Sequence, residues 1–392
     1  MIVKRALILA ILFFAMFFVS GCSGGGIGGL IEEGLWVADM YDYFDDDSYD
    51  VYEDNPVDPS YPVVPVAPAY APYVAVLDSG NDSMILINRN SIDGDSPDVQ
   101  EVPIDPGART VAYCNRTGFM YVGCEGLLLS VYMDGNFSKY GNEVDGSALV
   151  ASDFSSVLFG SYGSAGLAWL DCSLYGEVSA SKNANVDGSP EHAAVSPFGA
   201  YAAVSGVCGD GMGVVICETD TGLSRSVDRA GNRGLDVTGD GTVFSVLFDG
   251  SGFTLNKSSF DGGLSASIDL STDMYNPWGV ACVEYQDGKS EVFVTDCSED
   301  GGIFVYNADD LSYAGRLGVS CVCPKHISRS PEGDALYAVV QGYEDGGDAA
   351  LLKIDPSLDV DSAVVAEVDL GGVSGSVLEG LAVMPYEKDW DW

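Results

Sequence analysis

The chain has 392 residues, of which 59 are acidic and 17 are Lys or Arg, so its formal net charge at pH 7 is −42. Such a surface repels phosphate backbones, which argues against nucleic acid as a partner. A hydrophobic content of 47% excludes a disordered chain. An acidic surface is also common in salt-adapted proteins, so the charge alone identifies no partner.

Residues 1–21 have the pattern of a secretory signal peptide. Lys4 and Arg5 precede an almost unbroken apolar run over residues 6–19, which is short for a membrane-spanning helix. The run leads into residues 19–22, Val-Ser-Gly-Cys, which resemble the bacterial lipobox. An uncleaved signal anchor and an ordinary secretory signal are the alternatives.

The lipobox resemblance implies cleavage before Cys22 and attachment of acyl chains such as palmitate to that cysteine. Several acyl chains on one residue would hold the protein stably on a lipid bilayer. Because Ser23 and not Asp follows Cys22, the resemblance favours the outer membrane, where the organism has one. We therefore expect a cell-envelope lipoprotein whose membrane partner is the bilayer.

Residues 22–72 differ in composition from the rest of the chain. Residues 23–29 are rich in Gly, residues 39–58 are acidic without Lys or Arg, and residues 56–72 are interrupted by prolines. Like charges repel and proline favours extended backbone, so we predict a semi-extended tether. The alternative is that its acidic part binds a cation or a basic partner.

From residue 73 onward, one pattern of short apolar strands and Gly/Asp turns recurs seven times. Polar turns that end at or near Gly precede most copies, as at residues 115–118 and 330–333. We predict the second strand of each copy at residues 73–76, 120–123, 156–159, 201–204, 243–247, 292–295 and 336–340. A strand-only repeat of about 45 residues is typical of a β-propeller, so we predict an all-β, seven-bladed β-propeller over residues 73–392.

The first copy lacks its first strand, and a matching segment stands at the other end of the chain. Residues 379–385 have the pattern of the first strand in the other copies. We therefore predict that this C-terminal strand pairs into blade one and closes the ring, which removes the open sheet edges. An open solenoid would leave the permuted order unexplained.

Two segments carry a resemblance to known repeats. Residues 293–296, Phe-Val-Thr-Asp, and residues 324–340 resemble the YVTN-type repeats of bacterial surface propellers and the related seven-bladed lactonase family. Residues 78–82 are similar to NHL repeats. The resemblance covers residues 73–392 and implies the fold far more strongly than an activity, because propellers include binders, scaffolds and enzymes.

The residues just before the first strand of each blade are expected to surround one mouth of the central channel. Alignment of the copies places these residues at the first mouth position: Arg109, Ser147, Glu191, Arg233, Trp278, Lys325 and Glu379. The next position holds Thr110, Ala148, His192, Gly234, Gly279, His326 and Gly380. Both histidines of the chain therefore fall in one ring.

Scarce basic residues gather in the same place. We predict that Arg109, Arg233 and Lys325 bind a small anion, because fixed cationic donors suit carboxylate or phosphate. Trp278 is expected to stack on that ligand, and Arg329 is expected to point into the channel.

Three functions follow from this ring. The first is a binding or interaction module for a small anion or an envelope protein, without a cofactor. The second is a lactonase-like hydrolase, implied by the family resemblance, in which His192 or His326 is the acid/base and Glu191 or Glu379 its partner. The third is a purely structural envelope protein in which opposite charges of the ring pair with each other. We expect a monomer.

Cysteine pairing is predicted at one place only. Cys297 and either Cys321 or Cys323 lie on loops at one face, where a disulfide is a hypothesis. Cys114 is expected to oppose Phe119 in a hairpin and so not to pair with Cys124. Several thiols are expected to stay free, and no cysteine spacing predicts a metal site.

Overall fold

The computed structural model describes residues 71–386, except residues 133–138, 153–157, 163–165, 174–175, 185, 187, 209–210, 229–232, 286, 320–321, 343–348 and 371–376. The predicted signal peptide, Cys22 and nearly all of the predicted tether lie outside the described residues. Within that part of the chain, no helix is long and apolar enough to cross a membrane.

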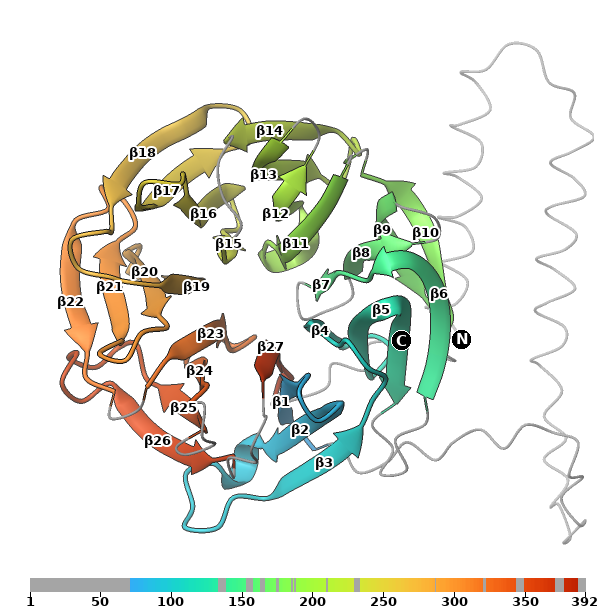
Figure 1. The fold of residues 1–392 in the computed structure, drawn as a ribbon, viewed down its shortest axis with the longest axis horizontal. Helices are drawn as coiled ribbons and strands as arrows, with labels where there is room; N and C mark the ends of the chain where they lie inside the picture. The colour runs from blue at the N-terminus through green and yellow to red at the C-terminus, as the bar shows by residue number, and fades with distance from the viewer. Residues whose placement is uncertain are drawn as a thin grey trace, which may run out of the picture. The chain divides into compact units, whose positions relative to one another are not determined.

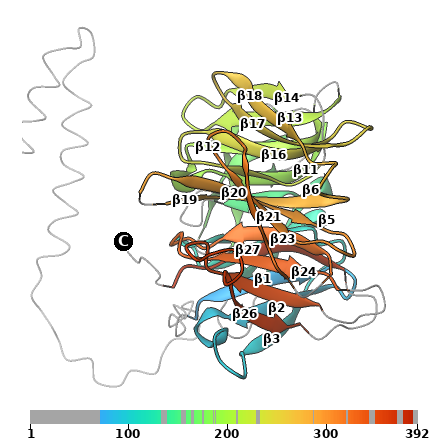
Figure 2. The ribbon, with the colours of Figure 1, turned by 90° about the vertical axis from the view of Figure 1, so that its left-hand side faces the viewer.

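Seven β-sheets surround a central axis, which confirms the predicted all-β, seven-bladed propeller (Figure 1). Figure 2 shows the same ring from its edge. From the innermost strand outward, blade one consists of β27 (Leu378–Val383), β1 (Tyr73–Asp78), β2 (Ser83–Asn88) and β3 (Val99–Pro103). Blade two consists of β4 (Thr110–Cys114), β5 (Phe119–Tyr132) and β6 (Lys139–Ser147). Blade three consists of β7 (Val150–Ser152), β8 (Leu158–Tyr162), β9 (Gly166–Cys172) and β10 (Val178–Asn183).

The remaining four blades follow the chain order from the axis outward. Blade four consists of β11 (Gly188–Val195), β12 (Tyr201–Cys208), β13 (Gly211–Glu218) and β14 (Ser224–Asp228). Blade five consists of β15 (Leu235–Val237), β16 (Thr242–Phe248), β17 (Phe253–Ser259) and β18 (Gly263–Asp269). Blade six consists of β19 (Pro277–Glu284), β20 (Ser290–Asp296), β21 (Ile303–Asn307) and β22 (Tyr313–Leu317). Blade seven consists of β23 (Pro324–Arg329), β24 (Leu336–Val340), β25 (Ala350–Ile354) and β26 (Val364–Asp369). Two single-turn 3-10 helices are η1 (Arg89–Ser91) and η2 (Pro197–Gly199).

Strand β5 folds back on itself. The rings of Phe119 and Tyr132, at its two ends, have centroids 4.9 Å apart, whereas an extended strand of this length would span about 45 Å. The reversal falls at Gly126, whose φ of +73° is a conformation that glycine adopts without steric cost. Both halves of β5 therefore act as separate strands of blade two, as the repeat pattern predicts.

The core lies between neighbouring blades because both faces of each sheet are buried. In β1, Val74 and Val76 pack against blade seven, whereas Ala75 and Leu77 pack against blade two. Alternate residues of a strand point to opposite faces. A strand buried on both faces must therefore be apolar throughout, and this explains the short unbroken apolar runs that reveal the repeats.

The C-terminal strand closes the ring as predicted. Strand β27 pairs antiparallel with β1, with Val383 opposite Val74 and Leu378 opposite Asp78. A disulfide joins Cys297 to Cys323, which confirms one of the two predicted pairings. Cys321 lies outside the described residues, and Cys114 pairs in register with Phe119 as expected.

Candidate ligand site in the central channel

The mouth of the channel is formed where the inner strands begin, and β-bulges shape it. The pairing register shifts directly after a proline in three inner strands: Pro190 in β11, Pro277 in β19 and Pro324 in β23. Proline has no N–H to give to the ladder, so within a sheet it is tolerated where a bulge interrupts the ladder. A bulge inserts an unpaired residue and re-aims side chains, and here Glu191, Trp278 and Lys325 lie in the bulges.

Lys325, His326 and Glu379 form one charged cluster at the mouth. The Lys325 Nζ lies 2.9 Å from Glu379 Oε1, and His326 Nε2 lies 3.5 Å from Glu379 Oε2. Burial acts to raise the pKa of Glu379, but the neighbouring imidazole and ammonium outweigh it and lower this pKa to about 2. Burial lowers the pKa of His326, so its imidazole is neutral near pH 7. Lys325 and Glu379 therefore satisfy each other, as the structural hypothesis predicts for part of the ring.

A second cluster surrounds the indole of Trp278. The Arg233 guanidinium carbon lies 4.1 Å from a Trp278 ring centroid, and Lys325 Nζ lies 5.1 Å from it. The His192 ring meets the indole edge-on at 6.4 Å. The ring therefore brings four predicted site residues together around one aromatic surface, held by cation–π contacts.

Of the two cations in this cluster, Arg233 is the one that forms no ion pair with a carboxylate of the residues that the structure describes. Burial lowers its pKa, which the charge of Glu191 partly opposes. Within the described part of the chain, its Nη2 reaches only the Asn276 side-chain oxygen, at 3.5 Å. Among the described residues, its buried Nε has no hydrogen-bond partner. The guanidinium thus keeps donor capacity for a further acceptor.

A mouth chamber of about 130 Å³ lies in the channel, and we define it by the lining residues Arg109, Thr110, His192 and His326. Arg233, Trp278 and Lys325 do not line it, but each directly precedes a residue that does: Gly234, Gly279 and His326. Arg109 is exposed and makes no ion pair with the residues that the structure describes. The glycine positions of the histidine ring are too crowded for side chains. A Cβ on Gly234 would lie 2.6 Å from the Trp278 carbonyl oxygen.

An apolar girdle separates this chamber from the rest of the channel. It takes one residue from each inner strand: Val111, Val150, Ala193, Leu235, Val280, Ile327 and Leu381. These side chains line both the mouth chamber and a second cavity of about 150 Å³, the deep chamber. The girdle is therefore the apolar layer between the mouth chamber and the deep chamber.

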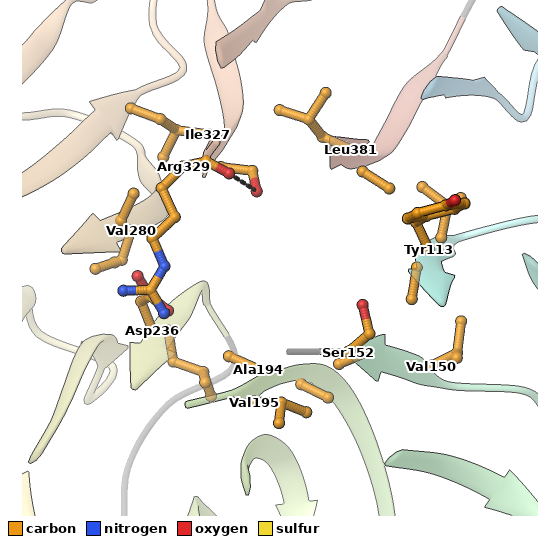
Figure 3. Close-up of a pocket in the computed structure, with 18 residues that line it drawn as sticks. Tyr113, Val150, Ser152, Ala194, Val195, Asp236, Val280, Ile327, Arg329 and Leu381 are labelled. Carbon is orange, nitrogen blue, oxygen red and sulfur yellow. Dashed lines mark hydrogen bonds and ion pairs between the residues drawn. The ribbon is translucent and has the colours of Figure 1, made fainter. Parts of the chain in front are cut away.

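The deep chamber contains one opposed pair of charges (Figure 3). Arg329 points into it as predicted, and its Nη2 lies 3.9 Å from Asp236 Oδ1. Arg329 also donates to the carbonyl oxygens of Val237 and Cys282, at 3.3 and 3.4 Å. Asp236 accepts from the Cys282 N–H at 2.8 Å. Arg329 is therefore held below the girdle, away from the three basic residues of the mouth.

Asp236 was missed at the sequence level, although a signal for it exists. One residue beyond the girdle, six inner strands carry a small side chain: Ala112, Ala151, Ala194, Ala281, Ser328 and Ala382. The seventh strand has Asp236 at this layer. Alignment carried one position further along the inner strands would have revealed the single acid.

The predicted alignment of blade three is wrong by one residue. Ser147 does not begin the inner strand but ends β6, opposite Glu125. Val150 and not Leu149 occupies the girdle layer, so Ala148 and not Ser147 corresponds to Arg109. The register of the inner strand of blade three depends on where β6 of the preceding blade ends, and the local sequence does not predict that end.

No protein-family model matches this chain, and no curated protein matches it either. Solved structures match by shape. The periplasmic gluconolactonase PpgL of Pseudomonas aeruginosa is 15% identical with a TM-score of 0.52, and the match covers 81% of this chain and 100% of that one.

A chain of the mitotic checkpoint complex is 13% identical with a TM-score of 0.52, over 68% of this chain and 83% of its own length. TolB from Acinetobacter baumannii is 11% identical with a TM-score of 0.46, over 80% of this chain and 67% of its own. At such identities the likeness is one of fold. This chain is thus a seven-bladed β-propeller with structural neighbours of varied roles.

Proposed function

We propose that this protein is a binding module whose mouth chamber takes a small organic anion carrying a carboxylate. The observation that carries the proposal is Arg233, whose guanidinium is held on Trp278 while its buried Nε has no partner among the described residues. An Arg fork suits a planar carboxylate, and a charge-assisted hydrogen bond is about twice as strong as a neutral one.

The position of Arg109 supports the same ligand. It belongs to blade two and Arg233 to blade five, which lie across the ring from each other (Figure 1). The mouth chamber is lined by Arg109 and by Gly234, the residue after Arg233, and its volume of about 130 Å³ admits only a small molecule. On a chain of net charge −42, diffuse attraction does not recruit anions. Capture therefore depends on these fixed local donors.

Calorimetric titration with succinate, gluconate and inorganic phosphate tests this proposal. We expect a carboxylate to bind the parent protein, and Arg233→Gln combined with Arg109→Ala to weaken it by about tenfold or more. Arg116→Ala removes an exposed arginine from the turn at the other end of β4 and is expected to bind like the parent. Equal binding by the double variant, or binding of phosphate alone, would contradict the proposal.

Lactone hydrolysis is the competing outcome of the same experiment. The neutral imidazole of His326 beside Glu379 is the arrangement of an oriented general base. Turnover of small lactones by the parent protein that disappears in His326→Asn would replace the binding module with a hydrolase.

The proposal places this module in the cell envelope, on a lipid anchor at Cys22, and assigns its blades to the YVTN type. The support is the basic start, the apolar run over residues 6–19 and the Val-Ser-Gly-Cys sequence of residues 19–22. We expect Cys22→Ser to move the protein from the membrane fraction to the soluble fraction of fractionated cells. Retention in the membrane would point to an uncleaved signal anchor.

A further inference from the structure

The deep chamber contains a pair of opposite charges that the proposed function does not use. Of the residues that line this chamber, only Arg329 and Asp236 are charged. Their side chains are 11% and 13% exposed, so both are largely shielded from solvent. In such surroundings a charge acts more strongly than it does in bulk water. The chamber therefore offers one positive and one negative group to a ligand and has no net charge of its own.

Backbone groups hold the two charges in place. Arg329 Nη2 and Asp236 Oδ1 are 3.9 Å apart, which is too long for a hydrogen bond. Asp236 accepts from the N–H groups of Val237 and Cys282, each at 2.8 Å. Arg329 donates to the carbonyl oxygens of the same two residues, at 3.3 and 3.4 Å. Within the described part of the chain, these two bonds leave the guanidinium with donors for a ligand.

The small side chains of this layer leave room for such a ligand. One residue beyond the girdle, six inner strands carry Ala or Ser, and the chamber has a volume of about 150 Å³. A cavity of about this volume holds a molecule of about six heavy atoms, such as benzene. Figure 3 shows the Ser152 hydroxyl pointing into the chamber from blade three, across from Arg329. The chamber thus combines two fixed charges and a hydroxyl with a small apolar wall.

The charges decide which class of ligand fits. A simple anion would be repelled by Asp236 and a simple cation by Arg329, whereas an apolar molecule would remove solvent from both charges without replacing it. A molecule that carries both charges a few bonds apart satisfies both groups. Such a zwitterion has no net charge, so the net charge of −42 on the chain does not repel it.

We propose that the deep chamber is a second binding site, which takes the zwitterion of a small α-amino acid. The carboxylate accepts from the Arg329 guanidinium and the ammonium donates to the Asp236 carboxylate. The volume limits the side chain of the ligand to about the size of that of alanine or serine. Because only the girdle residues line both chambers, this site is separate from the mouth chamber and does not depend on the proposed function.

Calorimetric titration of the full-length protein with glycine tests the proposal. We expect glycine to bind the parent and the mouth variant with Arg233→Gln and Arg109→Ala equally well. In that variant, acetate and methylamine, which each carry only one of the two charges, are expected to bind at least about tenfold more weakly than glycine. Phenylalanine is the size control and is expected not to bind. No binding of glycine to the parent, or its loss in the mouth variant, would overturn the proposal.

Removal of one charge at a time is expected to change which ligand binds. Asp236→Asn, which keeps a side-chain oxygen for the Cys282 N–H, is expected to weaken glycine binding by about tenfold or more. Acetate is expected to bind this variant more tightly than it binds the parent, because only Arg329 remains charged. Methylamine is expected to gain in the same way in Arg329→Gln.

This exchange of ligands distinguishes loss of a charge from loss of the fold. A chamber that no longer folds would lose all three ligands, and equal urea midpoints of variant and parent verify that folding is intact. Succinate, which tests the mouth chamber, is expected to bind both variants like the parent, so failure of one site does not count against the other. Unchanged glycine binding in Asp236→Asn, or no gain of acetate in it, would contradict the assignment.

Discussion

A chain that ends at Val377 is expected to lose the folded propeller, because the removed strand β27 is the inner strand of blade one. Leu378, Ala382 and Val383 are almost fully buried, and five residue pairs align β27 with β1. Without them, β1 becomes an open, apolar sheet edge that faces the channel, and such edges promote aggregation.

Solubility, circular dichroism and urea unfolding check this expectation. The control moves residues 378–386 to a position directly before Ala71 in the truncated chain. Met384 donates its N–H to the Tyr73 carbonyl, so the transplanted strand needs only a short connection and is expected to restore the fold. A truncated chain that stays soluble with the parent's urea midpoint would mean that ring closure contributes little.

Replacement of Arg89 by Met is expected to destabilise the protein by about 3–5 kcal/mol, the cost of breaking a buried ion pair. Arg89 is 1% exposed, and its Nη2 lies 2.9 Å from Glu332 Oε2. Its Nε donates to the Tyr337 hydroxyl at 3.1 Å, and Nη1 donates to the Met384 carbonyl oxygen. One side chain of blade one thereby holds blade seven and the end of the closing strand.

Urea unfolding of the variant measures this effect, and an exposed ion pair provides the control. Lys289 Nζ lies 3.4 Å from Asp287, and both side chains are exposed. Lys289→Ala is expected to change the stability by less than about 0.5 kcal/mol. If Arg89→Met behaves like this control, then the closure of the ring rests on strand pairing alone.

Propeller architecture was predictable because its signal is local and repeated. A strand buried on both faces needs a continuous apolar run, and each hairpin needs a turn residue such as Gly118 or Gly333 with positive φ. Positive φ recurs at the corresponding turns of other blades, at Gly199, Gly241 and Gly288, so the copies support one another. The permuted strand at residues 379–385 could be recognised for the same reason.

The same alignment identified residues of the candidate site, but it did not predict which of these residues pair with each other. Aligned copies place Lys325 and Glu379 at the first mouth position and both histidines at the next. The pairing of Lys325 with Glu379 across two blades depends on how the bulges turn the side chains. Blade three shows the limit, since a one-residue shift at the end of β6 moved its whole mouth register.

Taken by itself, the sequence determined the class of fold, the number of blades, the closing strand and the layer of the channel where scarce cations and histidines gather. Only the tertiary structure decided which charges satisfy each other, that Asp236 meets Arg329 below an apolar girdle, and that Arg89 ties blade one to blade seven. Strand patterns follow from the burial of each residue along its own chain segment. Side-chain partners depend on how neighbouring blades are spaced, and the sequence of a single segment does not determine that spacing.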